Sequence, residues 1–312
     1  MPCRVAKCLL GLIMQPDLTL SIISADNLDL LLPCLCSVFE HTYHITLEVY
    51  VVDNASTDST EATVKERFSQ IKVIHNEARQ GFSTNNNMVL RQGQGRYLML
   101  LNDDTLVLEG ALDRLVEFMD THPAAGAVGS FLLNPDCTFQ PAFARFPHPI
   151  VEAIWPAANW SFRLVKQMTE PFEVDSVHGA AMLVRRQVIE QIGVLDTAFD
   201  PIYSEEIDWC YRIKQAGWKI FTLPQAQIIH YGSQTMNRAV PRKYELLLSH
   251  KLLFLRKHKG VLTANVYRSL LGLSTTIKLV WWTLSSLLQP YRQTNAERRQ
   301  LHWYLLKRIP YL

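Results

Sequence analysis

The stretch at residues 97–105 constrains the fold more than any other part of the chain. Residues 97–101 (YLMLL) are large and apolar, which is typical of a strand buried on both faces of a sheet. The apolar run stops abruptly at Asn102, Asp103 and Asp104. This order places two carboxylates at the carboxyl end of a central strand, where open α/β sheets bind their ligands.

Two adjacent carboxylates beside an apolar core cost free energy unless a cation or hydrogen bonds offset their charge. Mg²⁺ and Mn²⁺ prefer oxygen ligands and often bridge to the phosphates of a substrate. We therefore expect Asp104, helped by Asp103, to hold Mg²⁺ or Mn²⁺ on a nucleotide diphosphate. The simpler alternative is that Asn102 or Asp103 caps a turn, because Asn and Asp are common turn residues.

Strand and helix patterns alternate from residue 18 to this central strand. The expected strands cover residues 18–24, 47–52, 71–75 and 97–101, and the expected helices cover residues 28–40, 58–68 and 81–92. This alternation predicts βαβ units and an α/β fold whose sheet is mostly parallel and flanked by helices. Right-handed crossovers place the carboxyl ends of the strands on one rim.

Polar residues follow these strands and are expected on that rim: Asn27, Asp53, Asp58, Asn76, Asp103 and Asp104. Asp53 directly follows an apolar strand, so its carboxylate can accept from a ribose hydroxyl or from the ring N–H of uracil or thymine. The alternative is an Asx turn, although Asp58 suits that role better, as the N-cap of the next helix. No dinucleotide-binding or P-loop glycine motif is present, so these nucleotide-binding classes lose their main support.

The second half of the chain continues with a helix expected at residues 106–121 and strands at 125–129 and 131–133. Residues 134–173 are rich in Pro and aromatic residues, and such a long irregular stretch is typical of a functional loop or lid. The aromatic side chains of this stretch can pack either on the rings of a sugar or in the hydrophobic core. A strand is expected over residues 174–185, where Gly179 and Ala180 would let a substrate approach the backbone closely.

An acidic helix start follows at residues 204–208 (SEEID). Ser204 is the expected N-cap, and acids in the first turn compensate the helix dipole. Apolar neighbours also favour a partly buried site, where burial raises the pKa of a carboxylate toward the range of a general base. Strands are expected at residues 219–223 and 228–230, and the second ends at His230, which suits a metal, a phosphate or a structural role.

Taken together, these segments resemble family 2 glycosyltransferases, and in particular the rhamnosyltransferase-like branch that builds bacterial surface polysaccharides. The matching segments are residues 51–58 (VVDNASTD), Gly81–Phe82 with Asn86–Asn87, residues 100–105 (LLNDDT), Gly179–Ala180, residues 204–208 with Arg212, Ala216–Gly217, and His230. Their order and spacing fit over residues 18–235. The resemblance implies a GT-A (Rossmann-like) domain at residues 18–237, after a leader at residues 1–17.

The resemblance also implies roles for individual residues. Asp53 would contact the nucleotide base, Asp103 would lie near the ribose, and Asp104 would bind the metal with His230 near the metal or diphosphate. Glu206 would be the catalytic base. The other implied nucleotide-sugar contacts are Asn27, Asn76, Gly81, Phe82, Gly179, Ala180 and Glu205.

Three residues depart from the family pattern. Asn102 begins the acidic motif where an Asp is usual, Glu206 stands where the family usually has Asp, and Asp26 replaces a Tyr that packs on the base in relatives. These departures leave a catalytically inactive, nucleotide-sugar-binding relative as an alternative. A sugar-phosphate nucleotidylyltransferase is disfavoured, because residues 25–29 (ADNLD) lack the glycines and basic residues that hold a triphosphate.

The implied reaction is an inverting displacement at an anomeric carbon, with no covalent intermediate. The donor would be a dTDP- or UDP-linked sugar, with rhamnose among the candidates. The acceptor would be a hydroxyl of a saccharide or of a lipid-linked saccharide. Mg²⁺ or Mn²⁺ would neutralise the departing diphosphate.

Charge is unevenly distributed along the chain. Residues 238–312, the basic tail, carry 14 Lys or Arg and 2 Asp or Glu, while residues 1–237 carry 17 and 27. Two apolar helices are expected in this tail, at residues 244–259 and 269–289. Because Lys278 lies near the middle of the second, it is expected to lie in the membrane interface rather than to cross it. Packing on the catalytic domain or in a homodimer is the alternative.

No nucleic-acid recognition module accompanies the basic charge, so nucleic acid is not an expected partner. The six cysteines show no zinc-binding spacing and are expected to be reduced and mostly buried. Together with the basic tail, they predict a cytoplasmic protein that is peripheral at the inner face of the cell membrane.

Overall fold

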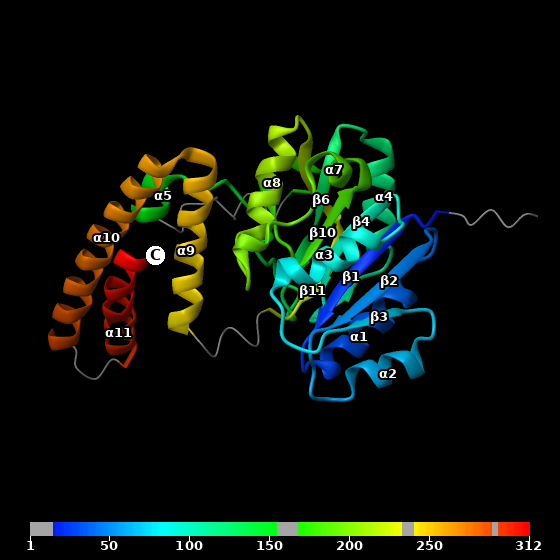
Figure 1. Cartoon of the computed structure of the whole chain (residues 1–312), viewed down its shortest axis with the longest axis horizontal. Coiled ribbons are helices and arrows are strands. Elements are labelled where there is room, and N and C mark those ends of the chain that lie inside the picture. Colours follow the sequence, from blue (N-terminus) through cyan, green and yellow to red (C-terminus); the bar gives the residue numbers. More distant parts are fainter. Residues whose placement is uncertain (1–14, 155–167, 233–239, 289–292) are drawn as a thin grey trace, which may run out of the picture.

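The computed structural model describes residues 15–154, 168–232, 240–288 and 293–312 (Figure 1). Residues 1–14 of the expected leader therefore lie outside the described residues, as do Cys3 and Cys8. Cys34 and Cys210 are buried, Cys36 is half-buried and Cys137 is exposed, and all four are free thiols. Burial raises the pKa of both Cys34 and Cys210 to about 12, so these thiols are neutral.

The domain is built on a nine-stranded sheet with the order β3-β2-β1-β4-β10-β6-β11-β5, and β8 pairs with β11. Its strands are β1 (Leu18–Ser24), β2 (Leu47–Asp53), β3 (Lys72–His75), β4 (Tyr97–Asn102), β5 (Thr105–Val107), β6 (Ala125–Leu133), β8 (Phe172–Glu173), β10 (Ala181–Arg185) and β11 (Lys219–His230). The first four strands in this order are parallel, and β10 is antiparallel to both of its neighbours. The predicted α/β fold with a mostly parallel sheet is confirmed.

Helices flank this sheet because their apolar residues recur at helical spacing. They are α1 (Leu28–Glu40), α2 (Thr60–Arg67), α3 (Phe82–Gln92), α4 (Ala111–Thr121), α7 (Arg186–Ile192) and α8 (Glu205–Gln215). In α1, for example, Leu31, Leu35 and Val38 are fully buried in the main core. Asn27 occupies the N-cap position of α1, but its side chain makes no capping hydrogen bond.

The helix predicted at residues 106–121 is shorter than expected. The chain first forms β5 and only then α4, with Gly110 between them in the left-handed conformation (φ 65°) that glycine adopts at little cost. β5 pairs antiparallel with the end of β11, so that Thr105 lies opposite His230. The chain therefore runs from Asp103 and Asp104 directly into β5, and His230 of the neighbouring strand β11 lies beside it.

Three other strand predictions need correction. Residues 125–133 form one strand, and residues 219–230 form another that stays continuous through a register shift between Leu223 and Gln227, where Pro224 lacks a backbone donor. Residues 174–185 instead form two strands, β9 (Ser176–Val177) and β10, separated by a turn. They separate because β9 pairs with β7 (Phe143–Ala144) in a small second sheet, whereas β10 enters the main sheet.

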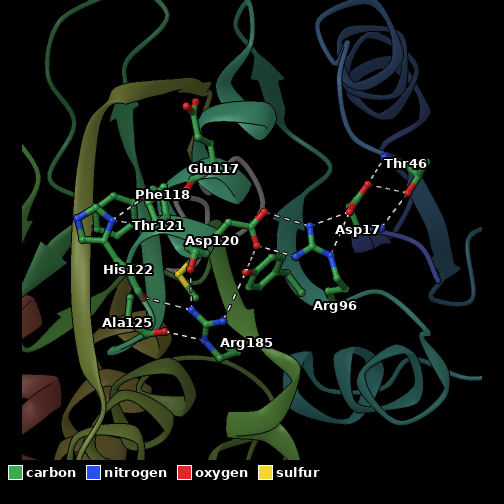
Figure 2. A network of polar contacts seen from close by, with 12 residues as sticks. Asp17, Thr46, Arg96, Glu117, Phe118, Asp120, Thr121, His122, Ala125 and Arg185 are labelled. Atoms are coloured by element: carbon green, nitrogen blue, oxygen red, sulfur yellow. Dashed lines mark hydrogen bonds and ion pairs between the residues drawn. The ribbon is translucent and has the colours of Figure 1, made fainter. Parts of the chain in front are cut away.

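The end of the sheet away from the acidic turn is closed by a polar network (Figure 2). Arg96, just before β4, donates to Asp17 at 2.8 Å and to Asp120 of α4 at 2.6 Å. The hydroxyl of Tyr97 also donates to Asp120 at 2.6 Å, and Arg185 of β10 donates to the carbonyl oxygen of Met119 at 2.7 Å. The network therefore ties the start of β4, the end of β10 and α4 together, at the end of the sheet opposite the acidic turn.

The basic tail forms α9 (Val240–Lys259), α10 (Val261–Leu288) and α11 (Gln293–Arg308), which gather with α5 (Pro149–Ile154) on one side of the sheet domain (Figure 1). Buried apolar residues of α9 and α10, including Phe254 and Tyr267, form a second core with Phe199 of the sheet domain. Ile207 and Tyr211 of α8 pack against this core. The tail's first helix, α9, thus packs on the sheet domain.

Candidate active site

The acidic turn after β4 lies beside His230. Asp104 is buried, and its Oδ1 lies 3.2 Å from His230 Nε2 but has no hydrogen-bond partner among the described residues. The backbone N–H of Tyr231 donates to the Asp104 carbonyl at 2.9 Å and holds the two segments together. Because an unpaired buried carboxylate oxygen is costly, this arrangement fits a bound cation.

The tautomer of His230 supports the same conclusion. Its Nδ1 lies 2.6 Å from Gln140 Oε1, while Gln140 Nε2 donates to Asn134 Oδ1 and to the His230 carbonyl. These bonds assign the ring proton to Nδ1. The unprotonated Nε2 then accepts from the side-chain amide of Asn102 at 3.3 Å and lies beside Asp104 Oδ1. A carboxylate oxygen and an imidazole nitrogen facing each other are donors that suit a divalent metal such as Mn²⁺.

Gln140 was not predicted from the sequence. It lies in the stretch rich in Pro and aromatic residues, and only its contacts reveal its role. A Gln in an irregular segment carries no local signal for the orientation of a histidine elsewhere in the chain.

Asp103 lies beside Ser24 and Asn27, where β1 ends and α1 begins. Burial raises the pKa of Asp103 to about 7; Ser24 and Asn27 act in the opposite direction, and the charge of Asp104 raises it further. The structure therefore brings Asn27, Asp103 and Asp104 together, as the sequence predicted. Asp104 Oδ1 is buried without a hydrogen-bond partner in the described chain, so the site holds a polar atom still to be satisfied.

The ends of β2 and β3 form a neighbouring part of the rim. Asp53 is buried; its Oδ1 accepts from the Ser56 N–H at 3.0 Å, and its Oδ2 lies 2.9 Å from His75 Nδ1. Asp53, Glu61 and His75 place ligand atoms within 4.8 Å of one another, close enough for a metal, but Asp53 Oδ2 already contacts His75 Nδ1. Asn76 donates through its backbone to Asp53 and through its side chain to Asn85 at 2.6 Å.

The residue that departs from the family pattern at position 26 has a structural role of its own. Asp26 adopts a left-handed conformation (φ 54°) and accepts from the Thr57 N–H at 2.5 Å. It also pairs with Arg79. This side chain therefore joins the loops after β1 and β2.

The start of α3 approaches the start of α8 at Gly179. A Cβ on Gly179 would lie 3.5 Å from Phe82 Cζ and 3.7 Å from Glu206 Cβ. The next residue, Ala180, accepts a 2.9 Å hydrogen bond through its carbonyl from the Asn102 N–H. The turn between β9 and β10 thus links the acidic turn to Glu206.

Gly81 has a different function from Gly179. A Cβ at Gly81 would lie 2.1 Å from Asp200 Cγ, so only glycine fits there. Asp200 accepts from the Ser83 N–H at 2.9 Å and from the Thr84 hydroxyl at 2.5 Å, which satisfies donors at the start of α3. Gly81 therefore lets the loop before α8 cap α3.

The acidic start of α8 is held by unusual backbone geometry. Tyr203 and Ser204 both have left-handed conformations (φ 87° and 70°), each costing about 1–3 kcal/mol for a residue other than glycine. Ser204 is at the N-cap position but makes no side-chain capping bond, contrary to expectation. The two left-handed residues directly precede Glu205 and Glu206, so the strained backbone sets the position of these glutamates.

Burial dominates the electrostatics of these two glutamates. It raises the pKa of Glu206 to about 7, and it raises the pKa of Glu205 well above the usual range, with the charge of Glu206 adding to the shift. The Oε2 atom of each has no hydrogen-bond partner among the described residues. A carboxylate with a pKa near neutrality is suited to accept a proton.

A cleft of about 410 Å³ opens beside Glu206. His178, Tyr203 and Glu206 line the side formed by the catalytic domain, and Lys243 and Lys251 of α9 line the other. A second molecule that reaches Glu206 from this side would therefore contact the basic tail. His178 and α9 were not predicted as parts of the site.

Two solved structures share this architecture. A mannosyltransferase from Pyrobaculum calidifontis in complex with GDP-Man and Mn²⁺ is 18% identical, with a TM-score of 0.60, over 94% of this chain and 86% of that one. GalNAc-T7 with UDP, GalNAc and Mn²⁺ is 17% identical, with a TM-score of 0.58, over 78% of this chain and 48% of that one. The chain therefore has the GT-A type of fold.

The sequence comparisons specify the family. The model of "Glycosyl transferase family 2" matches residues 6–193, and the chain belongs to this family. An N-acetylglucosaminyl-diphospho-decaprenol L-rhamnosyltransferase of Mycobacterium tuberculosis is 26% identical over 212 residues, 62% of this chain and 69% of the relative. The O-antigen biosynthesis protein RfbC of Myxococcus xanthus is 25% identical over 234 residues, 70% of this chain and 17% of that protein.

Proposed function

We propose that this chain is an inverting glycosyltransferase that moves a sugar from a nucleoside diphosphate to a hydroxyl acceptor, with residues 18–237 as its catalytic domain. The observation that carries the proposal is that two parts of the site are connected, namely Asp104 with His230 and the start of α8 with Glu206. The unpaired Asp104 Oδ1 beside His230 Nε2 suits a metal–diphosphate, and the Asn102–Ala180 hydrogen bond leads from there to Gly179, against Glu206.

In the proposed reaction, Asp53 binds the nucleotide base and Asp103 lies near the ribose, with Asn27, Asn76, Gly81, Phe82, Ala180 and Glu205 completing the donor site. Asp104 and His230 hold Mg²⁺ or Mn²⁺, which stabilises negative charge on the diphosphate. Glu206 takes the proton of the acceptor hydroxyl. At the same time the acceptor oxygen bonds to the anomeric carbon, and the bond between that carbon and the diphosphate breaks. Attack from the opposite face inverts the anomeric configuration.

We further propose rhamnose, carried on dTDP or UDP, as the transferred sugar and a lipid-linked saccharide as the acceptor, within bacterial surface polysaccharide synthesis. The similarity to the mycobacterial rhamnosyltransferase supports this specificity. The cleft beside Glu206, bounded by lysines of α9, provides room for an acceptor that carries phosphate. The family match leaves the nucleotidylyltransferase alternative without support.

The basic tail is proposed to rest on an anionic membrane at the cytoplasmic face. Leu273, Ile277, Trp281 and Leu284 are all more than half exposed, and their spacing places them along one side of α10. An exposed apolar stripe on a strongly basic segment fits a helix lying in the interface of an anionic bilayer. No helix in the described ranges is both long and apolar enough to cross a membrane.

The proposed activity is tested by incubating the purified protein with dTDP-rhamnose and a panel of UDP-sugars, with Mn²⁺ and candidate acceptors. Release of nucleoside diphosphate with product of inverted configuration supports it. The inactive relative is supported instead if the protein binds a donor but releases nucleoside diphosphate from none, and if Glu206→Gln binds the donor equally well. Glu190→Gln on the exposed surface of α7 is the matched control, because it removes a carboxylate remote from the site.

A further inference from the structure

A second cavity lies inside the helical bundle formed by α5, α9, α10 and α11. It has a volume of about 240 Å³, and most of the residues that line it are apolar, among them Leu248, Leu271, Leu301 and Leu305. Cavities of this kind bind apolar ligands, since water gains few hydrogen bonds inside them. The site chemistry described above does not use this cavity.

The bundle cavity is adjacent to the cleft beside Glu206. Leu247 and Lys251 line both spaces. Lys243, Leu247 and Lys251 follow one another at four-residue intervals, so one side of α9 runs from the cleft to the cavity. The wall shared by the two spaces is therefore a single face of one helix.

Positive charge marks the boundary between the two spaces. Lys243 and Lys251 line the cleft, Lys251 and Lys278 line the cavity, and Lys251 is paired with the buried carboxylate of Glu152. Glu152 and Glu206 are the acidic residues that face these spaces within the described chain, and burial raises the pKa of Glu206 to about 7. Lys251 lies where the two spaces meet, with Lys243 on the cleft side and Lys278 on the cavity side, so lysines outnumber the acidic residues along this wall and favour an anionic group there.

We propose that the two spaces form one acceptor site, with the bundle cavity holding part of the apolar chain of a lipid-linked acceptor. The phosphate groups of that lipid lie at Lys243 and Lys251, and its terminal sugar reaches Glu206 in the cleft. This inference rests on the proposed transfer to a lipid-linked saccharide. It adds a chain-binding site that makes α9, α10 and α11 part of substrate recognition.

The test uses two acceptors with the same glycosyl diphosphate, one on a long isoprenoid chain and one on a short alkyl chain. Thr275, which is buried and lines the cavity, is replaced by Trp to fill it, and by Leu as a milder change. The control is Thr276→Trp, because Thr276 is the next residue of α10 and is exposed. Thr275→Trp is expected to raise the KM of the long-chain acceptor about tenfold, with Thr275→Leu intermediate and the short-chain KM unchanged.

A measurement that needs no turnover separates this inference from the proposed function. A photoreactive isoprenoid diphosphate is cross-linked to the full chain, and the labelled peptides are identified by mass spectrometry. Labels in residues 244–251, 271–278 and 301–305, lost in Thr275→Trp, support the chain site even if no sugar is transferred. Labels confined to the exposed side of α10, or equal KM changes for both acceptors, overturn it.

Discussion

Lys257, near the end of α9, donates a 2.6 Å hydrogen bond to the fully buried carboxylate of Asp208 in α8. Arg212 and His258 also contact this carboxylate, at 2.8 and 2.7 Å. Burial alone would raise the pKa of Asp208, but Lys257 and then Arg212 hold it below the usual value. Since Asp208 follows Glu206 by two residues, the basic tail helps to hold α8, which carries the proposed base, in place.

The first prediction concerns this buried carboxylate. Asp208→Asn removes the anion and leaves Arg212, Lys257 and His258 clustered, so we expect the free energy of unfolding to fall by about 3 kcal/mol. The value of kcat should fall as well, because α8 loses the ion pairs of Asp208 with α9 and keeps the apolar contacts of Ile207 and Tyr211. Denaturant unfolding and steady-state kinetics measure the two effects, and Glu190→Gln should change stability by no more than about 0.5 kcal/mol. Unchanged stability in Asp208→Asn would show that the contact contributes little.

The second prediction concerns pH. Because the pKa of Glu206 is raised to about 7, the base is protonated below that pH, and kcat/KM should rise with pH until it levels off above about 7. In the acid limb the rate should fall about tenfold per pH unit. The folded protein binds this proton more tightly than the unfolded chain, so Glu206 contributes stability that is lost as pH rises from about 4.5 to about 7. A flat profile between pH 5 and 8 would contradict the assignment of Glu206 as the base.

The positions of Asp104 and Glu206 at the ends of secondary-structure elements were predictable, because the sequence patterns that indicate them are local. Asp104 follows a run of buried-strand residues, and Glu206 begins a helix, so both were predicted where a periodic segment starts or stops. The contacts of Gln140 and Lys257 were not predictable, since their partners His230 and Asp208 lie 90 and 49 residues away in the chain. Periodicity reports which side of an element is apolar, but not which distant element covers it.

The turn at residues 178–180 was missed for a related reason. The whole segment from residue 174 to 185 has the composition of a strand, and composition alone does not distinguish strands that join different sheets. The break is decided by tertiary pairing of Val177 with Phe143 and of Ala181 with Leu101. That break places Gly179 between Phe82 and Glu206.

The third prediction tests Gln140 as a positioning residue for the metal. Gln140→Ala removes the acceptor that fixes the proton on His230 Nδ1, so we expect the affinity for Mn²⁺ to fall about 10- to 100-fold. Activity should recover at saturating Mn²⁺, whereas Asp104→Ala should stay inactive. Calorimetric titration with Mn²⁺ measures the affinity, with the exposed Gln92→Ala as control. Equal Mn²⁺ affinity in Gln140→Ala and wild type would rule out the positioning role.

The fourth prediction contrasts two glycines. Gly81→Ala forces a methyl group into the Asp200 carboxylate, so we expect it to lower the free energy of unfolding by about 1–3 kcal/mol. At Gly179 a methyl group meets Phe82 and Glu206 at ordinary contact distance, so Gly179→Ala should fold normally but raise the KM for the substrates. Thermal unfolding and kinetics on both variants separate the effects. The reverse result, with Gly179→Ala unstable and Gly81→Ala merely slow, would contradict the roles given to these glycines.

The fifth prediction concerns the exposed stripe of α10. Replacing Trp281 and Leu284 together with Ser removes two large apolar groups that solvent already reaches, so folding should change little while binding to anionic vesicles falls about tenfold or more. Flotation with phosphatidylglycerol vesicles measures binding, and raised salt should weaken it because the tail is strongly basic. Tyr43→Ser, at an exposed aromatic residue on the catalytic domain, is the control. Equal flotation of the double variant and the wild type would show that another surface of the protein meets the membrane.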